Sequence, residues 1–217
     1  GIFGTFDRGS LKRGFQIYAE VCVACHSLNY VAYRNLSAIG MDEDAIKEFA
    51  AEYEVEDGPN DEGEMFLRPA LPADSFVPPF PNEKAARSAN SGAYPPDLSL
   101  MVKARIGGPD YLYNLLTRYK EEAPEGFEIG EDMSYNEVFP GHQIAMAPPL
   151  DEESVEYEDG TPMTLEQHAK DITVFLAWTA NPELEERKKM GIKVLLFLIV
   201  LTGMLYALKR KIWAKLH

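Results

Sequence analysis

Five consecutive residues near the N-terminus, Cys22-Val23-Ala24-Cys25-His26, dictate much of what this sequence can become. A Cys-x-x-Cys-His stretch is the attachment signature of a c-type haem. The two thiols form thioethers with the haem vinyl groups, and their spacing places both sulfur atoms on one edge of the macrocycle. The adjacent His26 then presents its imidazole to the iron from the proximal side. The sequence therefore predicts one haem c, covalently attached through Cys22 and Cys25.

Two other sites use cysteine pairs, and neither fits as well. Both cysteines of the chain lie in this stretch, so none remains for a structural disulfide. A thioredoxin-like redox pair does not need the following histidine and lies near a βαβ pattern, which this sequence lacks. A zinc site needs two further ligands at close spacing, whereas the nearest other histidine is His142. The pattern favours haem over both.

The charge of the chain is divided unevenly along its length. From Arg187 onward there are eight of the 21 basic residues and none of the 35 acidic ones. Residues 1–186 therefore hold 13 basic against 35 acidic residues, a net charge of −22. The negative electrostatic field of such a domain repels nucleic acid and attracts a basic partner in a salt-dependent way. Any single acidic run can, however, simply keep the domain soluble.

The segment Met190–Leu208 has the composition of a membrane span. Its nineteen residues carry one charge, Lys193, near the start. At 1.5 Å per residue they would extend about 28 Å, close to the roughly 30 Å of a hydrocarbon core. Basic residues flank both ends in equal number, so the positive-inside rule does not fix the orientation. We predict a domain at 1–186 and a C-terminal anchor with a basic tail at 187–217.

The rest of the chain predicts a mostly α fold with long loops. Prolines exclude a helix over residues 69–81, and the acidic, turn-rich residues 121–140 and the later part of 42–64 are typical of exposed loops. A capping box at Thr164 and Gln167 opens a helix that ends before Asn181-Pro182. The other predicted helices cover residues 7–21, capped by Asp7 or Ser10, 41–49, 98–106, capped by Asp97, and 109–119.

A haem that only transfers electrons needs a second axial ligand, commonly a methionine. Met146 is favoured because it lies between two alanines, which let a flat ring approach, and because Pro148-Pro149 stiffens the chain behind it. His142 and His168 are the histidine alternatives, and the latter is expected to face solvent. The remaining methionine candidates are Met41, Met65, Met101, Met133 and Met163.

Several further motifs resemble the cytochrome c1 family, over essentially the whole chain. They are Arg13-Gly14-Phe15-Gln16, Cys22-x-x-Cys25-His26-Ser27-Leu28, Asn90-x-Gly92-Ala93-x-Pro95-Pro96-Asp97-Leu98-Ser99 and Met146-Ala147-Pro148-Pro149, together with the single C-terminal anchor.

The resemblance implies a cytochrome c-like haem domain and a set of roles within it. His26 and Met146 would be the axial ligands of the iron. Arg105 would contact a haem propionate, and Tyr111 would lie near the ring. Asn90, Ala93, Pro95 and Pro96 would line the haem. The extra cysteine pair of some family members is absent.

The resemblance also implies a function. The chain would be the electron-transfer subunit of a quinol–cytochrome c reductase, with no activity as an isolated enzyme. It would accept one electron from a Rieske iron–sulfur protein and pass it to cytochrome c, beside cytochrome b in a dimeric complex. Alternatives are a free-standing tail-anchored cytochrome c that serves an oxidase or nitrogen-oxide reductase, or a haem peroxidase with an open sixth position.

Haem attachment outside the cytoplasm fixes the expected location. We expect a bacterial cytoplasmic membrane with residues 1–186 in the periplasm, or alternatively a mitochondrial inner membrane with that domain in the intermembrane space. The chain starts at Gly1 without an initiator methionine, so we expect that a targeting segment has been removed.

Overall fold

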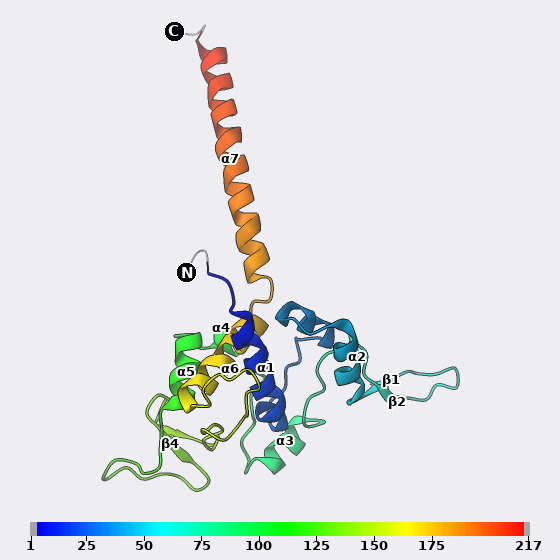
Figure 1. Cartoon of the computed structure of the whole chain (residues 1–217), viewed down its shortest axis with the longest axis vertical. Coiled ribbons are helices and arrows are strands. Elements are labelled where there is room, and N and C mark those ends of the chain that lie inside the picture. The colour runs from blue at the N-terminus through cyan, green and yellow to red at the C-terminus, as the bar shows by residue number, and fades with distance from the viewer. Residues whose placement is uncertain (1–3, 215–217) are drawn as a thin grey trace. The chain divides into compact units, whose positions relative to one another are not determined.

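A computed structural model describes residues 4–214. Gly1, predicted to follow a removed targeting segment, and the basic Lys215 lie outside the described residues. The chain forms two compact units, one of Phe6–Ala180 and one of the segment from Asn181 with residues 4–5 (Figure 1). The predicted boundary after residue 186 falls inside the last helix and stays a prediction. The elements are α1 (Arg8–Glu20), η1 (Cys22–Ala24), η2 (Tyr33–Ile39), α2 (Glu43–Ala51), β1 (Glu54–Asp57), β2 (Phe66–Pro69), α3 (Glu83–Ala89), α4 (Met101–Ala104), α5 (Pro109–Thr117), β3 (Tyr119–Lys120), β4 (Ser134–Asn136), β5 (Gln143–Ile144), α6 (Leu165–Thr179) and α7 (Leu184–Trp213).

The predicted mostly α fold is confirmed, and α1 begins where the sequence indicates. The Asp7 carboxylate accepts a hydrogen bond from Ser10 N at 2.7 Å, which satisfies one free N–H of the first turn. Helix α1 packs against α6 at Gly14, where an added Cβ would lie 2.1 Å from Asp171 O and 2.7 Å from Phe175 Cβ. The absence of a side chain at Gly14 therefore permits the close approach of the two helices.

Aromatic rings form the centre of the Phe6–Ala180 unit. Phe76 stacks on Tyr33 with ring centroids 4.6 Å apart, and Phe15 meets Phe175 of α6 at 5.8 Å. Stacked and tilted ring contacts of this kind add to the free energy gained by burying the rings. The cluster joins α1 and α6 to η2 and to the proline-rich segment that follows β2. Cys22 and Val23 of the Cys-x-x-Cys-His stretch pack against this core.

The structure contains two small antiparallel sheets in regions for which no strand was predicted. Strand β1 pairs with β2, and β4 lies between β3 and β5 in a three-stranded sheet. The prediction is wrong there because these strands lack the alternating apolar pattern that marks a half-buried strand. Arg68 on β2 instead binds both Asp57 on β1 and Asp74.

The predicted helix over 98–106 is also wrong in extent, because only Met101–Ala104 is helical. Asp97 does not cap that helix, whose N-cap is Leu100. The two glycines Gly107 and Gly108 adopt φ of +90° and +53°, and Pro109 opens α5 as predicted.

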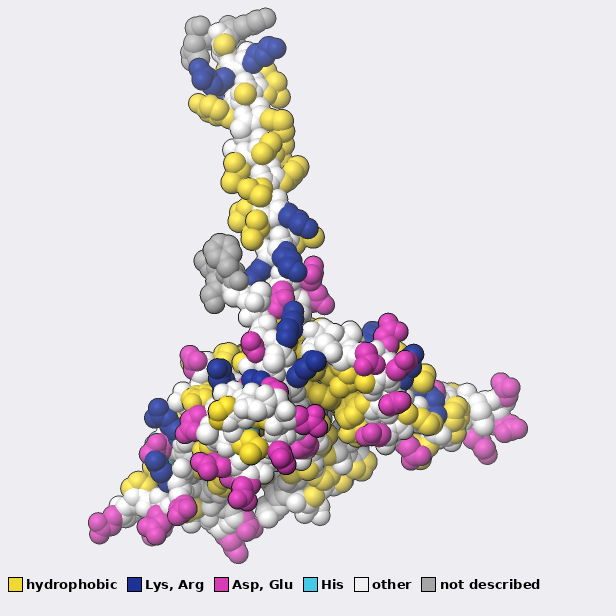
Figure 2. All heavy atoms as spheres, viewed as in Figure 1, with side chains coloured by type: hydrophobic (Ala, Val, Ile, Leu, Met, Phe, Trp, Pro, Cys, Tyr) yellow, Lys and Arg dark blue, Asp and Glu magenta, His cyan; other side chains and the backbone are white. Residues whose placement is uncertain are grey.

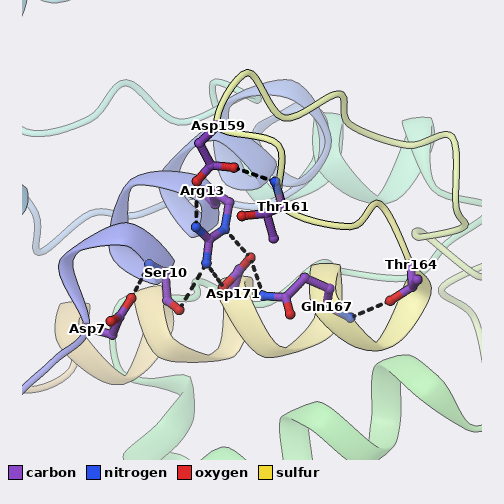
Figure 3. Close-up of polar contacts among 8 residues, drawn as sticks. All are labelled: Asp7, Ser10, Arg13, Asp159, Thr161, Thr164, Gln167 and Asp171. Carbon is purple, nitrogen blue, oxygen red and sulfur yellow. Dashed lines mark hydrogen bonds and ion pairs between the residues drawn. The ribbon is translucent and has the colours of Figure 1, made fainter.

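Helix α6 begins at a half-formed capping box. Thr164 Oγ1 accepts from Gln167 N at 3.2 Å, but the Gln167 side chain donates to Asp171 at 2.9 Å instead of returning to the cap (Figure 3). Asp171 is fully buried and also binds Arg13 of α1 at 2.7 Å. The other side of the Arg13 guanidinium binds Asp159, so one residue joins α1, α6 and the loop before α6.

In the second unit, α7 contains the predicted span Met190–Leu208. Among residues 4–214 it is the one helix long and apolar enough to cross a membrane. Hydrophobic side chains cover it, and Lys and Arg gather towards its ends (Figure 2). Lys188 Nζ donates to Gly4 O at 2.8 Å, and Lys209 Nζ lies 5.6 Å from the Trp213 ring centroid.

Candidate functional site

The Cys-x-x-Cys-His stretch leaves α1 as a tight turn. The short helix η1 starts at Cys22, whose carbonyl oxygen accepts from Cys25 N at 3.2 Å and from His26 N at 2.9 Å. Both cysteines are free thiols and are partly exposed. Tyr18, on the last turns of α1, donates through its hydroxyl to His26 O at 3.0 Å. The turn therefore holds two thiols and an imidazole close together just after the end of α1.

The imidazole of His26 is oriented by the Pro-Pro segment. His26 Nδ1 lies 2.8 Å from Pro96 O. A carbonyl oxygen only accepts, so Nδ1 carries the proton and Nε2 keeps the lone pair of the neutral ring. Burial lowers the pKa of His26, which favours that neutral form. This is the arrangement of a metal-ligating histidine whose second nitrogen is fixed by a backbone oxygen.

Asp97, expected only as a helix cap, connects the same segment to the motif. Its Oδ2 accepts from Ser27 Oγ at 2.9 Å and from Asn29 N at 2.8 Å. Its Oδ1 accepts from Ser99 N at 2.9 Å. One local signal points to this role, an aspartate directly after two prolines, but nothing in the sequence identifies its distant partners.

Met146 lies two residues beyond β5 and is half-buried. Its carbonyl oxygen accepts a hydrogen bond from Tyr119 Oη at 3.1 Å, so strand β3 of the same small sheet fixes its backbone. Burial, and secondarily the neighbouring Tyr111, raise the pKa of Tyr119, which keeps the phenol protonated as a donor. Nothing in the local sequence identifies Tyr119 as a partner of this loop.

The alternatives to Met146 occupy different settings. His168 is fully buried, which contradicts the expected solvent exposure, because its Nδ1 lies 2.9 Å from Asp151 O and its ring packs on Tyr157. His142 is exposed, has φ of +58°, and stacks on Tyr135 at 6.0 Å.

The remaining predicted site residues lie on the two segments around the Pro-Pro pair. Asn90 ends α3, where its side chain donates to Ala86 O at 2.7 Å, and Ala93 N donates back to Asn90 O at 2.8 Å. Arg105 is exposed, and its guanidinium donates to Ala104 O at 3.3 Å. The predicted site residues that follow the motif are half-buried except for Pro96 and Arg105, which are exposed; the half-buried ones are Asn90, Ala93, Pro95, Tyr111 and Met146.

The hydrogen bonds join part of the predicted set. They link His26 to Pro96 and Ala93 to Asn90, whereas Met146 is linked to Tyr119, which lies outside the predicted set. No hydrogen bond or ring contact among residues 4–214 connects Arg105 to the motif, so its role stays a prediction.

The chemistry of these donors fits a c-type haem better than the other sites that cysteines form. Burial raises the pKa of Cys22 to about 12, opposite to the lowered pKa of a reactive redox pair. Within residues 4–214 there is no group of three or more His, Cys, Asp or Glu side chains that could hold a metal ion. Two free thiols, an imidazole with a fixed tautomer and a half-buried thioether match the attachment groups and axial ligands of haem c.

Fold and site together define a class, that of helical proteins with a c-type haem segment and one helix of membrane length. Within it, the chain belongs to the cytochrome c1 family, since the sequence model of the Cytochrome C1 family matches residues 1–216. Membership implies a c-type haem.

Curated relatives come from bacteria and from mitochondria. "Cytochrome c1" of Rhodospirillum rubrum is 52% identical over 98% of this chain and 84% of its own length. "Cytochrome b/c1" of Bradyrhizobium diazoefficiens is 48% identical over the whole of this chain, which spans 35% of that longer protein. "Cytochrome b-c1 complex catalytic subunit, mitochondrial" of Candida albicans is 51% identical over 99% of this chain and 73% of its own length.

Proposed function

We propose that this chain is the membrane-anchored, monohaem electron-transfer subunit of a quinol–cytochrome c reductase. It accepts one electron from a Rieske iron–sulfur protein and passes it to cytochrome c. The observation that carries the proposal is the hydrogen bond between His26 Nδ1 and Pro96 O, which leaves Nε2 free beside two thiols. The relative from Candida albicans is named as a subunit of a b-c1 complex, which favours this function over a free-standing cytochrome.

In this proposal one haem is bound through thioethers to Cys22 and Cys25, and it supplies a reversible one-electron couple. His26 and Met146 would hold the iron from its two sides, and a haem held in this way would transfer electrons, whereas a peroxidase needs an open position. Pro96 holds the proton on His26 Nδ1. Tyr119 holds the backbone of Met146. The ring would be lined, and kept from water, by Asn90, Ala93, Pro95, Pro96 and Tyr111. Arg105 would bind a propionate.

The partners follow from charge and from the names of the relatives. Asp and Glu side chains spread over the visible face of the Phe6–Ala180 unit (Figure 2), a surface suited to a basic cytochrome c. A relative named as a cytochrome b/c1 supports cytochrome b as a neighbour, in a complex we propose to be dimeric. Because haem is attached outside the cytoplasm, the domain faces the periplasm or the mitochondrial intermembrane space and α7 anchors it.

The structure sharpens which carboxylates to neutralise in a docking test. Asp159 is paired with Arg13, whereas Glu152, Glu153, Glu156 and Glu158 are exposed. Replacing these four glutamates by glutamine should lower the association rate with cytochrome c, most strongly at low ionic strength. Replacing the four exposed glutamates Glu43, Glu48, Glu52 and Glu54 by glutamine provides a charge-matched control in another acidic run. A rate indifferent to both charge and salt would reject electrostatic steering.

The proposed function is tested by purifying the complex through this chain in mild detergent. The ratio of haem b to haem c is measured by pyridine haemochrome, and the iron–sulfur signal by electron paramagnetic resonance. We expect two haems b per haem c and a Rieske signal. Haem c alone after the gentlest extraction would instead identify a self-standing membrane cytochrome.

A further inference from the structure

Five hydrogen bonds join the turn that contains His26 to the segment that contains Pro96. They are His26 Nδ1 to Pro96 O, Ser27 Oγ and Asn29 N to Asp97 Oδ2, Leu98 N to Ser27 O, and Tyr30 N to Ser99 Oγ. Two of the five end on the Asp97 carboxylate, and Asp97 directly follows the residue whose carbonyl oxygen orients His26. Asp97 is therefore the side chain through which this segment is fixed to the turn.

Both oxygens of the Asp97 carboxylate accept hydrogen bonds. Oδ2 accepts from Ser27 Oγ and from the backbone N–H of Asn29, while Oδ1 accepts from the backbone N–H of Ser99. An amide of the same shape has one oxygen only. In whichever way it is turned, an asparagine would face one of the two backbone N–H groups with its own N–H₂. The site thus requires a carboxylate and not merely a small polar side chain.

Among the described residues, the charge of Asp97 has no cationic partner. Its hydrogen-bond donors are a hydroxyl and two backbone amides, and no Lys or Arg of residues 4–214 pairs with it. The carboxylate is also only partly exposed. A negative charge that is not neutralised by a partner and is partly removed from water acts strongly on groups nearby.

We propose that Asp97 is a positioning residue for the proximal ligand, which holds Pro96 O on His26 Nδ1 and lowers the reduction potential of the haem. The inference rests on the proposed function, in which His26 binds the haem iron. Two effects act in the same direction. The negative charge favours the oxidised iron, and the fixed Nδ1–H···O bond raises the basicity of the imidazole, which also favours the oxidised iron.

The test is Asp97→Asn in the full chain, assembled in its membrane complex. The haem c potential is measured by redox titration, and the geometry of the axial ligands by the g values of the oxidised haem in electron paramagnetic resonance. We expect the reduction equilibrium to shift towards the reduced form by about threefold or more, which is roughly 30 mV at 59 mV per tenfold for one electron. The g values should also change.

Asp42→Asn is the matched control. Asp42 caps α2 by accepting from Asp44 N and Ala45 N, so this variant loses the same charge at the same kind of turn without a link to His26. It should retain the parental potential and g values. Equal shifts in both variants, or parental values in Asp97→Asn, would overturn the inference.

If Asp97→Asn accumulates without haem, Ser27→Ala replaces it. This variant removes the 2.9 Å hydrogen bond to Asp97 but keeps the carboxylate, and it should alter the g values with haem content retained. Parental g values in Ser27→Ala would overturn the inference. Failure of the proposed function looks different, because the parental chain itself would then show no haem c in pyridine haemochrome.

Discussion

His26 and Met146 lie on segments that are fixed in unlike ways. Five hydrogen bonds tie residues 26–30 to 96–99, and one of them ends on the ring nitrogen of His26 itself. The Met146 segment is held through its backbone, by one bond from Tyr119 and, five residues on, by His168 at Asp151 O. An imidazole binds a metal well only when one ring nitrogen is deprotonated and the ring plane is oriented, so its side chain needs a hydrogen-bond partner. A thioether has no proton to fix, so support of the backbone is enough to position it.

The two segments share a support, since the motif follows α1 and His168 belongs to α6. Gly14→Ala should therefore damage both sides at once, because the new Cβ would lie 2.1 Å from Asp171 O. Overpacking typically costs about 1–3 kcal/mol, and contact with backbone places this variant at the upper end. We expect a strong loss of haem c from membranes and a lower urea midpoint for what remains.

Gly9→Ala is the control on the same helix, since its Cβ would meet only side-chain ends, of Arg13 and Asp7, at 3.3 Å. It should keep its haem. Parental behaviour of Gly14→Ala would show that the α1–α6 contact does not support the two ligand segments.

Met146→Leu should remove the proposed second ligand and leave the His26 segment unchanged. Loss of the thioether lowers the potential and opens the sixth position, so the reduced protein should bind carbon monoxide. His142→Leu, which alters an exposed side chain stacked on Tyr135, should leave the optical spectrum and potential as they are. An unchanged spectrum and potential in Met146→Leu would refute the ligand assignment.

Tyr119→Phe should weaken the support of the Met146 segment without removing the Met146 thioether. It deletes one hydrogen bond, of 3.1 Å, to Met146 O, and such bonds are typically worth about 1 kcal/mol. Displacement of Met146 by added imidazole should become about fivefold easier, as measured by optical titration. Tyr113→Phe, which removes a hydroxyl that donates no hydrogen bond among residues 4–214, is the control. Equal imidazole affinities in the two variants would contradict this role of Tyr119.

Asp159→Asn should have the smallest effect, visible only in acid. Hydrogen bonds from Thr161 and then from Arg13 lower the pKa of Asp159 from 3.8 to about 2. A lowered folded-state pKa contributes stability that is fully present above pH 3.8 and is lost as the pH falls through 2. The variant should therefore lose less stability than the parent between pH 4 and pH 2, as followed by urea midpoints. Parallel losses would show that the Arg13 cluster does not depend on this charge.

The sequence alone determined the features whose causes are local. Covalent spacing defines the Cys22–His26 segment, local polar residues limit the cap of α1 to Asp7 or Ser10, and nineteen nearly uncharged residues make α7 long and apolar enough to cross a membrane. The prediction of Met146 as a ligand likewise rests on small neighbours and stiff prolines, which are properties of adjacent residues. Such effects act within a few residues, so they can be inferred from the order of residues.

The tertiary structure decided which distant groups meet. Asp97, predicted as a cap, accepts hydrogen bonds from residues 68 to 70 positions away. Gln167 turns from its cap to Asp171, and His168 is buried instead of exposed. Tyr119 reaches Met146 across 27 positions, on a sheet that the sequence did not predict. A buried polar group must find a partner wherever the packed chain supplies one, and that choice is made only when the helices and loops come together.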